Sequence, residues 1–312
     1  MDNALVREFP PRTADKVERL LDLLEELGEH PSLLGKLALH GGTAINLFVL
    51  DVPRLSVDID VSYVGSLGRE EMLADRPLVE RAIGEVSRSQ GYSLSGGDGG
   101  HAGRTFVLRY RSAWGPDHVK IDCIYMNRSP VLPIARMSSP LRPDLGVSMF
   151  SDAELIGGKV KAFFDRVKTR DIYDISNLGR WLDSLSDEQS QLMHAVILYY
   201  ASLSAAFPHG FESRPQRFEG LQSELAAQLY PMLRRSEDRP ALESLIADAH
   251  SFVSDYVMPR TDMEREYLDR FERGDYRPSL LFADGDMAGR ACENPEALWK
   301  LENLRRMREH ET

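Results

Sequence analysis

Two aspartates separated by one residue, Asp58 and Asp60, are the side chains best placed to do chemistry in this sequence. They lie in LSVDIDVSYV (residues 55–64), where apolar and polar residues alternate, so the stretch is predicted to be a strand with both carboxylates on one face. Two carboxylates at this separation repel each other unless a positive charge lies between them. Magnesium is the natural occupant, because it prefers oxygen ligands and is commonly held by one or two carboxylates together with substrate phosphates.

A third carboxylate, Asp122, lies between apolar residues in the predicted strand HVKIDCIYM. Three carboxylates on adjacent strands could hold two ions, which would clamp the attacking and leaving oxygens of a phosphoryl displacement. Asp122 is therefore expected to be a third metal ligand or a base toward an acceptor hydroxyl. The alternative is that all three aspartates are ordinary solvated charges on an exposed strand face.

A glycine pair, Gly41 and Gly42, comes shortly before these aspartates and opens a predicted helix. Glycines let the backbone approach a triphosphate, and the N–H groups at a helix start can cradle phosphate, with the hydroxyl of Thr43 as a further donor. Ser56, on the polar side of the first strand, completes the expected nucleotide-binding set near the turn. The alternative is a plain turn, and His40 before it is expected to be structural.

A second group of charged residues lies further along the chain, where Lys159 and Arg166 share one face of a predicted helix. Lys159 suits a triphosphate as a compact charge, while Arg166 could pair with phosphate or with Asp171 on the next helix. The alternative is a salt-bridged pair of helices that joins two domains. Gly157 and Gly158 each cost about 1 kcal/mol in a helix interior, so a nucleotide or the first domain is expected to approach closely there.

The elements that must position these residues change character near residue 150. Strands and helices mix before it, and helical periodicity dominates after it. The later helices are predicted at residues 151–167, 171–182, 188–207, 218–234, 241–256, 264–273 and 295–310. The Pro/Ser-rich stretch 136–150 is expected to be the linker between the halves. The predicted fold class is α/β (α+β), with an α/β domain containing a small mixed sheet at 1–150 and a helical bundle domain at 151–312.

Composition sets the broad class of protein. The 312 residues are 42% hydrophobic and 28% charged, which is typical of a globular protein. The net charge of −11 disfavours a general nucleic-acid binder, yet residues 101–170 hold 12 Lys and Arg against 6 Asp and Glu, which permits a local basic surface. Two distant cysteines, a charged amino end and the lack of a long apolar run predict a cytoplasmic protein without a membrane span.

Four motifs follow one another in a recognisable order: GGTAIN, RLSVDIDVSY (residues 54–63), KVKAFFDR with Lys159, Ala162 and Arg166, and RDIYDISNL (residues 170–178). This order resembles the nucleotidyltransferase superfamily that includes DNA polymerase β. More narrowly, it resembles the AbiEii toxin family of bacterial type IV toxin–antitoxin systems, to which the mycobacterial MenT toxins belong. The resemblance covers residues 37–178 and implies a polymerase-β-like nucleotidyltransferase domain, with the helical domain completing the active-site cleft.

The resemblance also implies an activity. The expected enzyme is a toxin that moves NMP from an NTP to an RNA acceptor, with the 3′ end of tRNA preferred, and releases pyrophosphate. Its expected cofactor is Mg²⁺, with Mn²⁺ as the alternative, and its cognate antitoxin is expected to be encoded nearby. The implied catalytic residues are Asp58, Asp60, Asp122, Lys159 and Asp171. The open alternatives are transfer to a protein or small molecule, and a non-catalytic nucleotide- or RNA-binding module, against which the intact Asp-x-Asp and lysine motifs argue.

Overall fold

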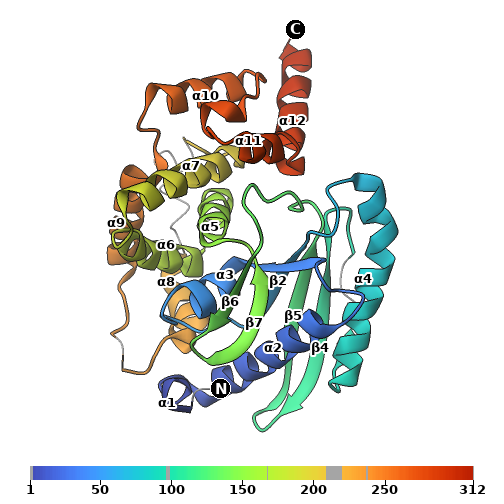
Figure 1. Cartoon of the computed structure of the whole chain (residues 1–312). Coiled ribbons are helices and arrows are strands. Elements are labelled where there is room, and N and C mark those ends of the chain that lie inside the picture. The colour runs from blue at the N-terminus through green and yellow to red at the C-terminus, as the bar shows by residue number, and fades with distance from the viewer. Residues whose placement is uncertain (1–2, 96–98, 167, 209–219, 237, 312) are drawn as a thin grey trace. The chain divides into compact units, whose positions relative to one another are not determined.

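The computed structural model describes the chain apart from residues 1–2, 96–98, 167, 209–219, 237 and 312 (Figure 1). The chain divides into two compact units. The first unit comprises Met1–Arg128, Ile134–Ser151 and Pro231–Asp238, and the second comprises Ser129–Pro133, Asp152–Tyr230 and Arg239–Thr312. Two short segments therefore belong to a different unit from the residues on either side of them: Ser129–Pro133 and Pro231–Asp238. The two domains predicted from the sequence, residues 1–150 and 151–312, stay a prediction.

The first unit is built on a seven-stranded sheet in the order β3-β4-β5-β2-β1-β7-β6. Its strands are β1 (Leu37–His40), β2 (Asp58–Tyr63), β3 (Ser93–Ser95), β4 (Gly103–Ser112), β5 (Gly115–Ile124), β6 (Ala135–Ser139) and β7 (Arg142–Met149). Strand β2 pairs with β5, and β1 with β7, in parallel, whereas the other neighbours are antiparallel. This mixed sheet confirms the predicted α/β class.

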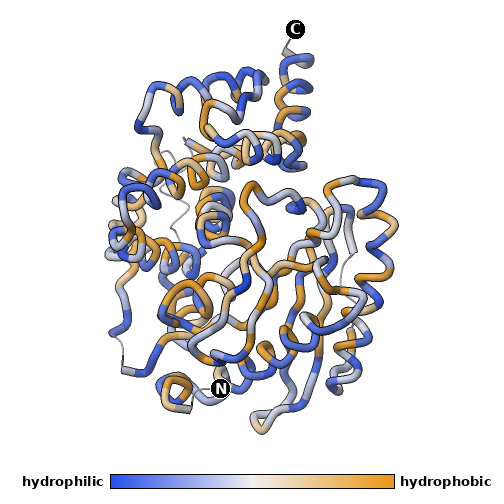
Figure 2. The backbone as a smooth tube through the Cα atoms, in the orientation of Figure 1, coloured by the Kyte–Doolittle hydropathy of each residue, from blue (hydrophilic) through white to orange (hydrophobic). Residues whose placement is uncertain are grey.

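Two long helices, α2 (Pro11–Glu29) and α4 (Arg69–Ser89), pack along one face of this sheet (Figure 1). Helix α2 buries a leucine-rich stripe, and the strands present β-branched and other apolar residues such as Ile59 and Ile121, which are fully buried. Figure 2 shows hydrophobic residues along the strands, and hydrophobic and hydrophilic residues following one another along the two helices. Short helix α1 (Asn3–Val6) precedes α2, and β1 leads into α3 (Gly41–Ala44) and the π-helical turn η1 (Ile45–Val49).

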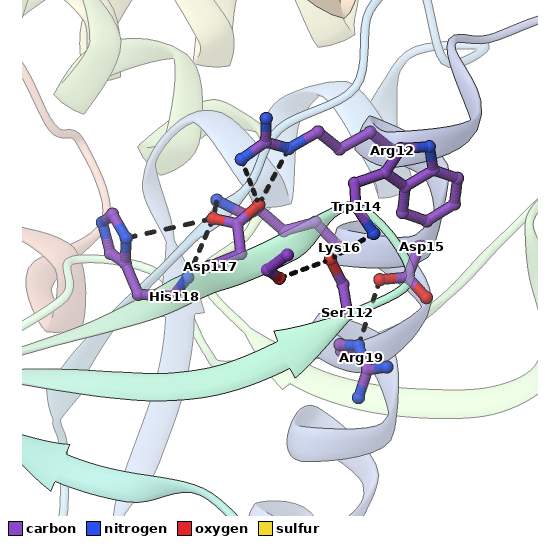
Figure 3. A network of polar contacts seen from close by, with 9 residues as sticks. Arg12, Asp15, Lys16, Arg19, Ser112, Trp114, Asp117 and His118 are labelled. Carbon is purple, nitrogen blue, oxygen red and sulfur yellow. Dashed lines mark hydrogen bonds and ion pairs between the residues drawn. The ribbon is translucent and has the colours of Figure 1, made fainter.

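One carboxylate, that of Asp117, ties α2 to the β4–β5 hairpin (Figure 3). It accepts hydrogen bonds from Arg12 Nε and Nη2 at 3.1 Å and forms an ion pair with Lys16 Nζ at 2.7 Å. The backbone N–H of His118 donates to it at 2.8 Å. Burial alone would raise the pKa of Asp117, but Lys16, the His118 N–H and Arg12 together lower it. The acidic charge on this side of the hairpin is therefore neutralised within the fold.

Strand β2 is shorter than the alternating pattern predicts, because it begins at Asp58 rather than at Leu55. The preceding residues pair instead with the segment 231–238, which returns to the first unit from far along the chain. Leu55 N donates to Met232 O at 2.8 Å, and Arg54 forms a bridge with Leu233. Arg235 N also donates to the carbonyl of Glu8 at 2.7 Å. The returning segment therefore fixes the entry of the chain into β2.

The predicted linker at residues 136–150 is wrong, because most of it forms the hairpin of β6 and β7 at one edge of the sheet. Strand β7 alternates in burial, with Leu145, Val147 and Met149 buried. Pro140 and Pro143 hide this alternation, since prolines are more often read as breaks. They are tolerated here because Pro140 lies in the turn and Pro143 is the second residue of β7, beside the register shift between Ser138 and Ser139 of β6.

The second unit is helical. Its helices are α5 (Asp152–Arg166), α6 (Thr169–Leu182), α7 (Asp187–Leu203), α8 (Leu221–Glu224), α9 (Leu242–Phe252), α10 (Asp262–Glu272), α11 (Gly285–Cys292) and α12 (Pro295–Glu311). Short turns of 3-10 or π-helix are η3 (Leu225–Leu229), η4 (Tyr230–Met232, which crosses into the first unit), η5 (Val253–Val257) and η6 (Pro278–Leu280). The helix predicted at 218–234 begins outside the described residues and continues as α8, η3 and η4. Helix α11 was not predicted. Within the described ranges, no helix is both long enough and apolar enough to cross a membrane.

Candidate active site

The glycine turn after β1 lies directly against the carboxylate of Asp60. Gly41 has a positive φ of 74°, a conformation that disfavours residues with a Cβ. A Cβ built on Gly41 would lie 2.2 Å from Asp60 Oδ2, which is closer than any real contact. His40, the last residue of β1, is also the register partner of Asp60. The sequence therefore needs glycine here for both the turn and the space beside the acidic side chain.

Strand register brings the three predicted carboxylates together on one face. Asp60 is paired with Asp122 in the parallel β2–β5 ladder, and Asp58 is paired with Lys120. Adjacent strands lie about 4.8 Å apart, so Asp60 and Asp122 are direct neighbours, with Asp58 two residues away along β2. All three are partly exposed, whereas Ile59 between the β2 pair is fully buried. The three carboxylates therefore lie on a part of this sheet face that solvent reaches, although Ser62 further along the same face of β2 is fully buried.

Asp122 is also held by a neighbour that the sequence analysis did not single out. The hydroxyl of Thr105 donates a hydrogen bond to Asp122 Oδ1 from strand β4, where the two residues are register partners. Thr105 thereby fixes the carboxylate of Asp122 on the side away from β2. No signal short of the strand pairing could have found this contact.

These carboxylates fit a magnesium site with few protein ligands better than a site in which side chains supply every ligand. In the part of the chain that the structure describes, no three His, Cys, Asp or Glu side chains are grouped as ligands of one ion. Magnesium does not need such a group, because it keeps several waters and uses one or two carboxylates together with substrate phosphates. Asp58 and Asp60 supply two such carboxylates beside a glycine that leaves room, so the residues present fit the predicted cofactor.

The predicted nucleotide-binding residues gather around the second glycine of the turn. A Cβ on Gly42 would lie 3.1 Å from Arg54 Nη2 and 3.3 Å from Ser56 Oγ. The Thr43 hydroxyl donates to Asp58 O at 2.5 Å, so its one proton ties the turn to β2. The phosphate contact predicted for that hydroxyl would require this bond to break. Arg54 was not predicted as a site residue, yet it is buried beside the turn with only 2% of its surface exposed.

His40 has the properties of a structural residue. Its ring stacks on Phe150 with centroids 5.7 Å apart. Burial lowers the pKa of His40 to about 4, although a hydrogen bond with the backbone of Val61 opposes this effect. The imidazole is therefore neutral near pH 7 and packs under the glycine turn, which agrees with the structural role expected from the sequence.

The site residues of the second unit form a buried ion-pair cluster between α5 and α6. Lys159 Nζ lies 2.9 Å from Asp171 Oδ1 and 2.8 Å from Asp174 Oδ2. Arg166 Nε lies 2.8 Å from Asp171 Oδ2, while Nη2 donates to Asp171 Oδ1 at 3.3 Å. The side chains of Lys159, Asp171 and Asp174 are 5%, 3% and 0% exposed. The salt-bridged helix pair that the sequence left open is thus present, and Asp174 joins the predicted residues.

The two cations of this cluster keep the carboxyl group of Asp171 ionised. Burial alone would raise the pKa of Asp171, but Lys159 and Arg166 outweigh it and hold that pKa well below its usual range. Lys159 is enclosed, whereas 60% of the Arg166 side chain is exposed. Of the two cations, Arg166 is therefore the one that a ligand can reach without opening the cluster.

The close approach expected at Gly157 and Gly158 is seen at the first glycine only, and there it comes from within the second unit. A Cβ on Gly157 would lie 2.7 Å from Cδ2 of Tyr200, so the ring of this residue on α7 packs against the glycine. At Gly158, nothing in the described structure lies within 4 Å of an added Cβ. The first glycine therefore permits helix packing inside the second unit, and nothing in the structure explains the second.

Glu154 on α5 is a buried carboxyl with an unusual environment. Its Oε1 accepts hydrogen bonds from the backbone N–H groups of Val131 at 2.5 Å and Leu132 at 3.4 Å, and from the Tyr200 hydroxyl at 3.1 Å. Burial raises the pKa of Glu154 to about 7, although these hydrogen bonds oppose the shift. Glu154 therefore anchors the segment 129–133 to two helices of the second unit.

Comparison with known families decides the assignment. Residues 22–273 match the family described as nucleotidyl transferase AbiEii toxin, Type IV TA system. The chain belongs to this AbiEii family. The resemblance inferred from the four motifs is thus confirmed, and the chain is a nucleotidyltransferase toxin of the type IV class, which implies an antitoxin partner.

The solved structure of one nucleotidyltransferase toxin agrees with this assignment at the level of fold. The MenT4 nucleotidyltransferase toxin of Mycobacterium tuberculosis H37Rv superposes with a TM-score of 0.53 at 17% identity, covering 96% of this AbiEii chain and 99% of MenT4. JHP933 from Helicobacter pylori superposes with a TM-score of 0.46 at 16% identity, covering 85% of this chain and 97% of JHP933. No curated protein sequence matches the chain.

Proposed function

We propose that this AbiEii protein is a magnesium-dependent enzyme that transfers NMP from an NTP to the 3′ hydroxyl of an RNA, with tRNA as the preferred acceptor. The observation that carries the proposal is the register of the partly exposed Asp58, Asp60 and Asp122 on one sheet face, with Gly41 packed against Asp60. Both cysteines are free thiols, Cys123 buried and Cys292 exposed, which fits action in a reducing cytoplasm.

In the proposed reaction, the acceptor hydroxyl oxygen attacks the α-phosphorus of the NTP. A new phosphorus–oxygen bond forms while the bond from the α-phosphorus to the α–β bridging oxygen breaks, and pyrophosphate leaves with that oxygen. Asp122, held by Thr105, takes the hydroxyl proton. Magnesium bound by Asp58 and Asp60 would neutralise charge on the phosphate oxygens.

The remaining residues receive proposed roles from family membership and local geometry. The backbone of Gly41, Gly42 and Thr43, together with Ser56, holds the phosphates. Arg166 is the exposed cation of the second unit and is the better candidate for a phosphate contact. Asp171 holds Arg166, and Lys159 compensates the buried carboxylates, so both act as positioning residues.

The test incubates the purified protein with total RNA and each α-labelled NTP in turn, with magnesium present. Label should appear in RNA with at least one NTP, together with one pyrophosphate for each nucleotide added. Asp58→Asn combined with Asp60→Asn should abolish the incorporation while the protein still unfolds cooperatively. Near wild-type transfer by this double variant would overturn the metal-site assignment.

The molecule that carries the label distinguishes the alternative functions. Label on the protein itself or on added small-molecule hydroxyls, with none on RNA, would replace RNA as the acceptor class. NTP binding without any transfer or pyrophosphate release would indicate a non-catalytic nucleotide-binding module.

A further inference from the structure

The β4–β5 hairpin has one buried and one basic face. Residues alternate in exposure along both strands, with Leu108 and Val119 fully buried toward the helices. The intervening positions on the other face are half-buried or exposed, and four of the exposed ones are basic or potentially basic: Arg109, Arg111, His118 and Lys120. We call these four residues the basic strip. Strand register pairs Arg109 with His118, so the strip runs across both strands.

The basic strip shares its sheet face with the carboxylates. Lys120 is the register partner of Asp58, and Asp122 is the partner of both Asp60 and Thr105. Partners in neighbouring strands point to the same side of a sheet. From Asp122 the strip extends toward the hairpin turn over roughly 20 Å, at about 3.3 Å per residue. A polymer bound along it would have one end at the acidic residues.

The glycine turn and the basic strip lie on opposite sides of these carboxylates. The strand order is β4-β5-β2-β1, so Asp60 on β2 has the turn that follows β1 on one side and β5 on the other. An NTP at the turn therefore leaves the β5–β4 side open for a second substrate. An in-line displacement needs this arrangement, with the attacking and leaving oxygens on opposite sides of the phosphorus.

Three of the four residues of the strip make no ion pair within the described part of the fold, whereas His118 Nδ1 lies 3.9 Å from Asp117 Oδ1. Arg111 and Lys120 make no ion pair or hydrogen bond there through their side chains, and Arg109 Nε donates only to the neutral Ser95 Oγ at 2.9 Å. On the opposite face of the same hairpin, Asp117 neutralises Arg12 and Lys16 instead (Figure 3). The three unpaired cations therefore give this face a local positive charge on a chain with a net charge of −11, which would attract an anionic partner.

Two other basic groups in the sequence do not share this property. Arg104, although next to Thr105 on β4, points to the helix side and pairs with Glu80 at 2.6 Å. Lys161 on α5 pairs with Asp165 at 2.9 Å and with Glu296 at 3.6 Å. Neither residue therefore offers an unpaired charge to an RNA.

We infer that the basic strip is the acceptor-binding surface and holds the phosphate backbone of a single-stranded RNA end, so that its terminal hydroxyl reaches Asp60 and Asp122. This inference rests on the proposed function, because it assigns the path of its acceptor. Arg109 and Arg111 lie two residues apart on one strand, roughly 7 Å, a spacing comparable with successive phosphates of an extended chain. Contacts of this kind read charge and not base identity.

The test compares two double charge reversals. Arg109→Glu with Arg111→Glu alters the strip, and Arg305→Glu with Arg306→Glu alters the same number of exposed arginines on α12, where both pair with Glu302. Binding of a fluorescein-labelled single-stranded RNA is measured by anisotropy over a series of salt concentrations, without NTP. The strip variant should lose roughly tenfold or more in affinity, with a salt dependence shallower by about 0.7 per lost phosphate contact. The α12 variant should bind like the unaltered protein.

Steady-state transfer separates this inference from the proposed function. The strip variant should raise the KM for RNA and recover kcat at saturating RNA, while its melting temperature shows that it is folded. If the unaltered protein labels RNA and the strip variant keeps its KM, or if the α12 variant is the one impaired, the surface is wrong and the function stands. If the unaltered protein binds RNA through the strip but labels none with any NTP, the proposed function fails and the surface stands.

Discussion

At the residue scale, the contact between Gly41 and Asp60 makes one glycine indispensable. Gly41→Ala places a methyl group where the carboxylate lies and forces alanine into a positive φ. The conformational penalty alone is about 1–2 kcal/mol, so the free energy of unfolding measured in urea should fall by at least that amount. Nucleotide transfer should fall further, because Asp60 must move.

The matched control is Gly158→Ala. This helical glycine has open space around an added Cβ, so alanine should raise the free energy of unfolding by roughly 0.5–1 kcal/mol through its better helix propensity. A lower free energy of unfolding for Gly41→Ala and a higher one for Gly158→Ala would support the packing of Gly41 against Asp60. A stable and active Gly41→Ala variant would contradict the packing of the turn on Asp60.

The buried lysine gives a second residue-scale prediction. Lys159→Met removes the charge that compensates Asp171 and Asp174, so the free energy of unfolding should fall by about 3–5 kcal/mol. Lys161→Met on the same helix breaks more exposed pairs and should cost about 1 kcal/mol or less. Transfer normalised to folded protein separates the two roles of Lys159. A variant with unchanged stability but lost transfer would mean that the lysine binds nucleotide directly.

At the scale of elements, Glu154 links the segment 129–133 to α5 and α7, and its pKa predicts a dependence on pH. The pKa of Glu154 is raised to about 7 in the folded protein, so the folded state holds a proton that the unfolded state releases above about pH 4.5. This stabilisation is complete below that pH and is lost as the pH rises through 7.

Glu154→Gln should therefore flatten the stability profile between pH 5 and 7.5 while keeping an oxygen to accept the hydrogen bonds from Val131 and Tyr200. The measurement is the urea midpoint at a series of pH values, for both proteins. Glu25→Gln, at an exposed carboxylate paired with Arg142, is the control and should leave the profile of this range unchanged. An unaltered slope in the Glu154→Gln variant would show that another group titrates there.

Periodicity along the sequence predicted local elements well and their partners poorly. The alternation around Asp58 and Asp60 placed both on one strand face, because side-chain direction depends only on local backbone geometry. The neighbour relation of Asp60 and Asp122 depends on a parallel pairing between distant strands, which no local pattern encodes. The same limit hid Asp174 as a partner of Lys159, and Arg54 as a buried neighbour of Gly42.

At the scale of the whole molecule, metal removal should affect catalysis and leave folding intact. A structural metal stabilises its protein through several ligands, but the described residues contain no group of three metal-ligating side chains. Excess EDTA should therefore abolish nucleotide transfer, with recovery on adding Mg²⁺, and change the melting temperature by no more than about 1–2 °C. A large drop in melting temperature would reveal a structural ion instead.

The returning segment 231–238 has a consequence for how this toxin is made. The backbone leading into β2 hydrogen bonds with Met232, and Glu8 with Arg235, so the first unit lacks these partners until that segment has left the ribosome. At about 5–20 residues per second, synthesis from Ser151 to Asp238 takes on the order of 10 s. During that interval the proposed carboxylates and the glycine turn have already been synthesised. The residues that lead into Asp58 still lack their hydrogen bonds with the segment 231–238. The segment that positions Asp58 should therefore reach its final conformation only after residue 238 has been synthesised.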